Sequence, residues 1–221
     1  PTGSASTTDA RYYVNGYEGT SVAAAKTNTV KGVNVYQVYG ALYNWPAAMN
    51  GATSSTAVPS GVQGLCPHGW HLPSDNEVKV MEVWAGMCTG TVSNPDFGKG
   101  CVDNMDFRGT INDNLGVGKS LKSTSGWAIP NSILASLSPN PNGSNDFGFN
   151  FLPGGGYDKG KFTTTNPLDA TEEISSIGAG GGFLTTTASG TSATYRLFTV
   201  MKSGVSVFGI TVPLKQHPHA V

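Results

Sequence analysis

The sequence is poor in charged side chains. Asp, Glu, Lys and Arg make up only 12% of its 221 residues, about half of the ~25% that is usual in soluble globular proteins. Disordered chains are rich in charge and poor in aromatic residues. This chain has little charge and 10% Phe, Trp and Tyr, so disorder is not expected. Gly, Ser, Thr and Asn take the place of charge, which favours a turn-rich β protein in an extracellular setting.

Basic clusters and long apolar runs are also missing. Lys and Arg number 13 against 14 Asp and Glu, and without a basic stripe the chain lacks the phosphate neutralisation that nucleic-acid binding needs. No apolar run approaches the ~20 residues that span a bilayer. We therefore expect no nucleic acid partner and no membrane span. Because the sequence starts at Pro1, we expect a processed or trimmed chain.

Cysteine is scarce, with three residues at Cys66, Cys88 and Cys101. The odd count allows at most one internal pair. Cys88 and Cys101 flank a polar loop, and a disulfide closing it would stabilise the fold by about 3 kcal/mol in the chain-entropy description. Cys66 lies in an apolar, aromatic segment and is expected to be a buried free thiol. The alternative, three reduced cysteines in a cytosolic protein, fits the lightly charged composition less well.

The strongest helix signal follows Ser74. Ser74 as N-cap and Glu77 at the third helical position form a capping box, which predicts one main helix over about residues 74–88. Apolar side chains at helical spacing predict its buried face; they are Val80, Met81, Trp84 and Met87. The side chains expected to project away from that face are Glu77, Lys79 and Glu82.

The remaining patterns predict strands and turns. Asn15-Gly16, between aromatic and β-branched residues, predicts a hairpin, and alternation predicts a strand over residues 30–39. The clearest strands are expected over 195–201 and 205–212. The glycine-rich runs Gly154–Gly156 and Gly178–Gly182 are expected to be turns. The four tryptophans are expected in the core; they are Trp45, Trp70, Trp84 and Trp127.

Several segments, in this order, resemble one family. They are YGALYNWPAAMNG (39–51), GVQGLCPHGWHLPSDNEV (61–78), GKSLKSTSGW (118–127), NDFGFNFLPGGGYDKGKF (145–162) and the strand GVSVFGITV (204–212). Together they resemble the Fibrobacter-type major paralogous domain (FISUMP) of secreted and surface proteins of Bacteroidetes-like bacteria. The resemblance covers about residues 30–212, and CPHGWHLPSDNE is its most specific stretch.

The resemblance implies an α+β, C-type-lectin-like fold, β-rich with one main helix and long loops. The single lectin-like domain is expected over residues 30–214. Residues 1–29 are then an N-terminal extension specific to this chain, and residues 215–221 a C-terminal tail.

Departures from the family pattern bear on the cysteines. Family members carry a cysteine in the last strand, which looks like the partner of the residue equivalent to Cys66, but this chain has Val207–Ile210 there. The resemblance therefore implies a free Cys66 and a Cys88–Cys101 disulfide that is specific to this chain. The related formylglycine-generating enzymes use cysteines late in the chain. No cysteine follows Cys101, so we expect no enzyme of that kind.

Metal ligands are sparse. His68 and His71 lie three residues apart, but the surrounding Pro and Gly predict an irregular loop with packed imidazoles rather than a metal site. An Asp- and Asn-rich stretch includes weak calcium candidates at Asp103, Asp106 and Asp113, since calcium is bound by six to eight oxygens in flexible loops. Such residues are also common turn formers. We expect no cofactor other than this weak calcium candidate.

Two functions fit these expectations for a secreted, non-enzymatic surface protein. The first is a structural or adhesive subunit that self-assembles with copies of itself into an extracellular filament or layer. Its N-terminal extension would add a strand to a neighbour's sheet, and such head-to-tail contacts propagate. The second is a C-type-lectin-like module that binds glycan or a surface protein through loops at 50–60, 89–114 and 138–160.

Overall fold

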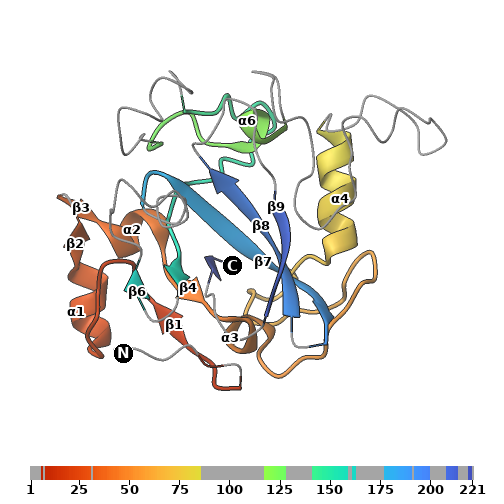
Figure 1. Cartoon of the computed structure of the whole chain (residues 1–221), viewed down its shortest axis with the longest axis horizontal. Coiled ribbons are helices and arrows are strands. Elements are labelled where there is room, and N and C mark those ends of the chain that lie inside the picture. Colours follow the sequence, from red (N-terminus) through yellow and green to blue (C-terminus); the bar gives the residue numbers. More distant parts are fainter. Residues whose placement is uncertain are drawn as a thin grey trace.

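The fold is an α+β arrangement around one six-stranded sheet (Figure 1). The computed structural model describes residues 6, 8–30, 32–85, 117–127, 141–158, 161–162, 177–190, 192–199, 208–213 and 219–220. Its helices are α1 Val22–Thr27, α2 Val35–Tyr39, α3 Trp45–Met49, α4 Asp75–Trp84 and α6 Val117–Leu121. No helix within these described ranges is long and apolar enough to cross a membrane.

The large sheet has the strand order β1-β4-β10-β7-β8-β9. Its strands are β1 Tyr12–Tyr13, β4 Leu42–Tyr43, β7 Gly180–Ser189, β8 Ser192–Thr199, β9 Phe208–Pro213 and β10 His219–Ala220. Two small hairpins accompany it, β2 Thr29–Val30 with β3 Val33–Asn34 and β5 Tyr157–Asp158 with β6 Lys161–Phe162. The antiparallel β7, β8 and β9 form the long part of the sheet, and β10 lies between β4 and β7 (Figure 1).

Each face of β8 packs against a different set of elements. Strand alternation places Tyr195 and Leu197 on one face and Arg196 and Phe198 on the other. The first face forms the core cluster with Leu184, Leu72 and the α3 residues Ala48 and Met49. The second face is covered by α4 and by the rings of Phe149 and Phe151. The sheet is therefore buried on both sides in its central part.

Helix α4 begins where the sequence predicts, but it buries a different face. The capping box is confirmed: Ser74 N–H donates to Glu77 Oε2 at 2.8 Å, and Glu77 N–H donates to Ser74 Oγ at 3.2 Å. The buried face carries Val78 and Glu82, however, whereas Val80 and Trp84 are 60% and 71% exposed. The predicted apolar face was therefore wrong for Val80 and Trp84, whereas Met81 is half-buried and Met87 lies outside the described residues. The helix also ends at Trp84 rather than near residue 88.

A buried arginine explains the orientation of α4. Arg196 on β8 is 1% exposed, and its Nε donates to Glu82 Oε1 at 2.6 Å. Arg196 Nη1 lies 2.6 Å from Asp75 Oδ1 as an ion pair, and Lys79 Nζ lies 3.1 Å from Asp75 Oδ2. Burial alone would lower the pKa of Arg196, but Glu82 and Asp75 outweigh it and raise that pKa. Asp75 and Glu82 face β8 because a buried charge without a partner costs several kcal/mol.

The structure differs from the sequence prediction in three places. Asn34 accepts from Gln37 N–H at 3.0 Å and caps α2, so the strand predicted over 30–39 was wrong beyond Asn34. Asn15-Gly16 does turn the chain, with Tyr17 N–H bonded to Val14 O at 3.0 Å, but the adjoining β1 pairs with β4 instead of forming a hairpin. Glycines 180–182 begin β7 rather than forming a turn.

The segment 117–127 is joined to the segment 141–151 around a buried lysine. Lys122 is 1% exposed, its Nζ donates to Pro141 O at 2.7 Å, and it lies 4.4 Å from the centroid of the Trp127 ring. Burial, with a smaller contribution from the nearby Lys119 charge, lowers the pKa of Lys122 to about 8. Ser123 N–H donates to Phe151 O at 2.9 Å, which ties this segment to the aromatic cluster on the sheet.

Substitutions of Arg196 and Glu82 should not have additive effects on stability. We expect Glu82→Leu or Arg196→Met alone to lower the free energy of unfolding by about 3–5 kcal/mol, because each leaves a buried charge. Glu82→Leu with Arg196→Met should recover at least about 2 kcal/mol of the summed loss, as urea unfolding of all three variants would measure. Asp9→Asn breaks an exposed pair with Arg11 and should leave the free energy of unfolding nearly unchanged, because solvent screens such a pair. If the stability losses of the two single variants simply added in the double variant, the Arg196–Glu82 pair would not contribute to stability as proposed.

Candidate ligand-binding groove

A groove of about 730 Å³ opens beside α4. Its walls come from α4, the loop at residues 69–73, the segment 149–155 and the start of β7, with Tyr39 at the end of α2. Known small-ligand sites have volumes of about 300–1,000 Å³, with mostly apolar linings and a few placed polar groups. The groove fits that description in size and chemistry.

Glycines make the floor of the groove. Gly155 and Gly181 are paired in a parallel bridge, and Gly155 N–H donates to Gly180 O at 2.8 Å. A Cβ on Gly181 would lie 3.0 Å from Leu152 O and 3.2 Å from Gly154 N, both backbone atoms. Any larger residue at position 181 would push the two segments apart. The glycine runs thus allow two backbones to approach closely where they line the groove.

Aromatic rings form the walls. Trp70 is 72% exposed and Phe149 is 40% exposed, although both are large apolar side chains. Phe149 stacks on Phe151 with centroids 6.2 Å apart, and Phe151 stacks on Phe198 of β8 at 4.3 Å. Phe149 is therefore held by rings anchored to the sheet while its outer face meets solvent. Rigid, exposed rings of this kind offer contact area at little cost in conformational entropy.

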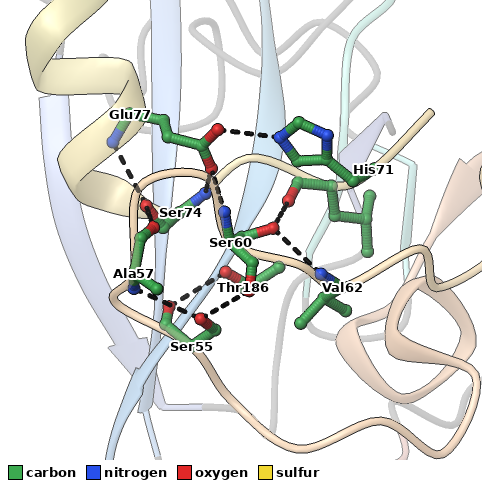
Figure 2. Close-up of polar contacts among 9 residues, drawn as sticks. Ser55, Ala57, Ser60, Val62, His71, Ser74, Glu77 and Thr186 are labelled. Atoms are coloured by element: carbon green, nitrogen blue, oxygen red, sulfur yellow. Dashed lines mark hydrogen bonds and ion pairs between the residues drawn. The ribbon is translucent and has the colours of Figure 1, made fainter. Parts of the chain in front are cut away.

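One hydrogen-bonded histidine–glutamate pair lines the groove. His71 Nε2 lies 2.7 Å from Glu77 Oε1, and Glu77 Oε2 accepts from Ser60 N–H at 2.9 Å and Ser74 N–H at 2.8 Å (Figure 2). Burial acts to raise the pKa of Glu77, but the backbone donor of Ser74, then His71 and Ser60, outweigh it and lower that pKa. The carboxylate therefore stays ionised and holds His71 at the groove wall.

A second layer of hydrogen bonds fixes the loops that carry these side chains. Ser55 Oγ donates to Ser60 O at 2.8 Å, and Ser74 Oγ donates to Ala57 O at 2.7 Å. Thr186 Oγ1 of β7 donates to Ser55 O at 2.9 Å, and Ser55 N–H donates to Thr186 O at 3.1 Å (Figure 2). The start of α4, the loop at 55–62 and β7 are thereby joined.

Ser60, His71 and Glu77 lie close together, but they do not form a nucleophilic triad. Ser60 Oγ donates to Leu72 O at 2.5 Å and accepts from Val62 N–H at 3.2 Å, so its proton points at a carbonyl instead of the imidazole (Figure 2). Ser60 is also 7% exposed. A serine nucleophile needs a base within reach of its hydroxyl proton, and this geometry suits positioning instead.

Of the cysteine and calcium sites predicted from the sequence, only Cys66 lies among the described residues. Cys66 is a free, half-buried thiol at the groove, and burial raises its pKa. The predicted Cys88–Cys101 disulfide lies outside the described residues. The weak calcium candidates lie outside them as well; they are Asp103, Asp106 and Asp113. Within the part of the chain that is described, no three His, Cys, Asp or Glu side chains gather as a metal site.

Two tryptophans expected in the core are on the surface. Trp127 is buried and Trp45 is half-buried, as predicted, but Trp70 and Trp84 are 72% and 71% exposed. Pro67, Gly69 and Pro73 around Trp70 indicated an irregular loop, and an aromatic residue in such a loop was the signal available for the groove. No sequence pattern indicated that residues 149–155 would line the same groove as Trp70, because that arrangement depends on the packing around β7.

Comparison with known proteins identifies the family. The family model for the Fibrobacter succinogenes major domain matches residues 7–202, and the chain belongs to this family. The match begins before residue 30, where the motif-based resemblance starts, and it includes β1, α1 and the groove segments. No curated protein and no solved structure matches the chain.

Glu77 should make the fold sensitive to acid. Because the pKa of Glu77 is lower in the folded state, its stabilisation is present above the unfolded value of ~4.3 and is lost as pH falls through the folded value. We expect the free energy of unfolding to fall between pH 5 and pH 3 more steeply in the parent protein than in Glu77→Gln, measured by urea unfolding at each pH. Equal slopes would show that Glu77 does not carry this stabilisation.

Proposed function

We propose that the chain is a secreted, non-enzymatic surface protein whose C-type-lectin-like domain binds a neutral glycan in the groove. The observation that carries this proposal is the exposure of Trp70 beside a hollow, glycine-floored groove. Monomeric proteins rarely leave connected apolar surface in contact with water without a role in binding. The lightly charged, Gly- and Ser-rich composition supports an extracellular location.

The chemistry of the groove favours a sugar chain over a purely apolar ligand. A pyranose ring has one face of C–H groups, which packs on an aromatic ring, and an edge of hydroxyl groups, which needs hydrogen bonds. Trp70 and Phe149 supply the rings, while His71 and Asn150 supply polar groups on the same lining. Glu77 is the one ionised carboxylate among the described lining residues and is already paired with His71, so an uncharged ligand suits the site.

Trp70 and Trp84 provide a matched test, since their exposures are nearly equal but only Trp70 lines the groove. On an array of neutral oligosaccharides, followed by calorimetry on the best ligand, Trp70→Ala should weaken binding at least tenfold because the sugar loses its stacking surface. Trp84→Ala should leave the affinity within about twofold of the parent protein.

Both variants should unfold at nearly the parent temperature, because neither side chain is buried. Absence of binding to any neutral glycan, or equal loss in the two variants, would contradict the proposal.

Self-assembly is a second candidate, favoured by the position of β10. His219 and Ala220 pair antiparallel with Tyr43 and Leu42, and Ala220 pairs parallel with Phe183. A two-residue strand inserted between β4 and β7 is easily replaced by the same strand from another copy, and exchange of identical elements is a low-cost route to assembly. Repeated head-to-tail exchange would produce an extracellular filament.

A disulfide that holds β10 in its own chain tests the exchange. In Tyr43→Cys with His219→Cys, the oxidised protein should stay monomeric, because the slot between β4 and β7 cannot accept a neighbour's strand. After reduction it should form filaments under the conditions in which the parent protein does, as seen by negative-stain imaging. His219→Cys alone is the control. Filaments from the oxidised double variant would rule out this route.

A further inference from the structure

A second hollow lies on a different part of the molecule from the groove. It has a volume of about 390 Å³ and is formed by the elements near the N-terminal end of the chain, namely β1, β4, α1, α2 and the turn at residues 17–21. Its walls carry five tyrosines and two basic side chains; they are Tyr12, Tyr13, Tyr17, Tyr36, Tyr43, Arg11 and Lys26. The volume is at the small end of the range for small-ligand sites.

The tyrosine rings are held in place by local structure. The Tyr12 and Tyr43 rings lie 6.5 Å apart across the β1–β4 pair. Tyr17 folds over Gly19, where an added Cβ would lie 2.6 Å from Tyr17 Cζ, and its hydroxyl accepts from Ser21 N–H at 3.2 Å. Residues 17–21 therefore build one wall of the pocket, and a larger residue at position 19 would displace the Tyr17 ring from its present place.

The Tyr43 side chain keeps its hydroxyl proton. Burial, followed by the neighbouring Tyr36 and Tyr12, raises the pKa of Tyr43. A protonated phenol both donates and accepts hydrogen bonds. The pocket thus offers flat rings with polar edges, which suits a ligand that is apolar on one face and hydroxylated around its rim.

The charge of the pocket is positive. Lys26 Nζ lies 5.4 Å from the centroid of the Tyr36 ring, and no carboxylate belongs to the described residues that line the pocket. At the rim, Arg11 Nη2 is paired with Asp9 Oδ2 at 3.2 Å, so Lys26 is the main source of positive potential. A ligand cation would be repelled, whereas an anionic group gains a charge-assisted contact.

We propose that this tyrosine pocket binds an anionic sugar residue, a pyranose that carries a carboxylate. The sugar ring packs on the tyrosine faces, its hydroxyls bond to the tyrosine hydroxyls, and its carboxylate lies toward Lys26. The site shares none of its lining residues with the groove. This proposal can therefore be tested independently of the neutral-glycan proposal.

The probe is tri-galacturonic acid, with galactotriose as its uncharged counterpart of equal length. Calorimetry at low ionic strength should show the acidic trimer binding the parent protein, and Lys26→Gln should weaken that binding at least tenfold. Tyr36→Ala should do the same by removing a stacking face. Lys119→Gln makes the same charge change on α6, away from the pocket, and should leave the affinity within twofold.

The remaining outcomes distinguish the two sites and exclude a folding defect. Trp70→Ala should not affect the acidic trimer, and near-ultraviolet circular dichroism should match the parent in every variant used. Amide chemical shifts of residues 11–43 should move on titration even in Tyr36→Phe, which keeps the ring. Equal affinity for both trimers, equal losses in Lys26→Gln and Lys119→Gln, or no binding of the acidic trimer would each overturn the proposal.

Discussion

The buried Arg196 sets the constraint on which the rest of this domain depends. A guanidinium placed on the inner face of β8 must be matched by carboxylates, and Glu82 and Asp75 supply them from α4. The two carboxylates are seven residues apart, so they lie on one side of the helix and fix both its rotation and its position over the sheet. The groove wall beside α4 follows from that placement. A cluster of charges, more than apolar burial, therefore decides which side of α4 faces the core.

The groove and the tyrosine pocket both contain a glycine that allows close packing beside aromatic rings. In both, glycine permits a close approach that brings aromatic rings to a surface: Gly181 lies against the backbone of residues 152–154, and Gly19 lies beneath Tyr17. Around the groove, the fixed carboxylate of Glu77 holds the loops that carry Trp70 and His71. The high glycine content thus supports rigid, exposed aromatic surfaces as well as turns.

Short-range signals in the sequence predicted what short-range chemistry controls. The capping box at Ser74 and Glu77 was confirmed because both partners lie within one helical turn, and the two late strands were found paired as β8 and β9. The orientation of α4 was mispredicted because the partner of Glu82 is 114 residues away. Residues 35–39 became helix because one asparagine at position 34 caps the chain there. The groove itself could not be predicted, since Trp70 and Phe149 come to line the same groove only through the folding of distant segments.

Strand β4 has a consequence for the order in which the fold can form. Its residues pair with β1 on one side and with β10 on the other, so Tyr43 contacts both Tyr12 and His219. A chain made from its N-terminal end can pair β1 with β4 early, but the connection from β4 to β7 has to wait until β10 has been made. Contacts of such long sequence separation slow folding. A chain in which β10 has not yet been made leaves β4 and β7 without their shared neighbour, and such a chain is therefore open to intermolecular pairing.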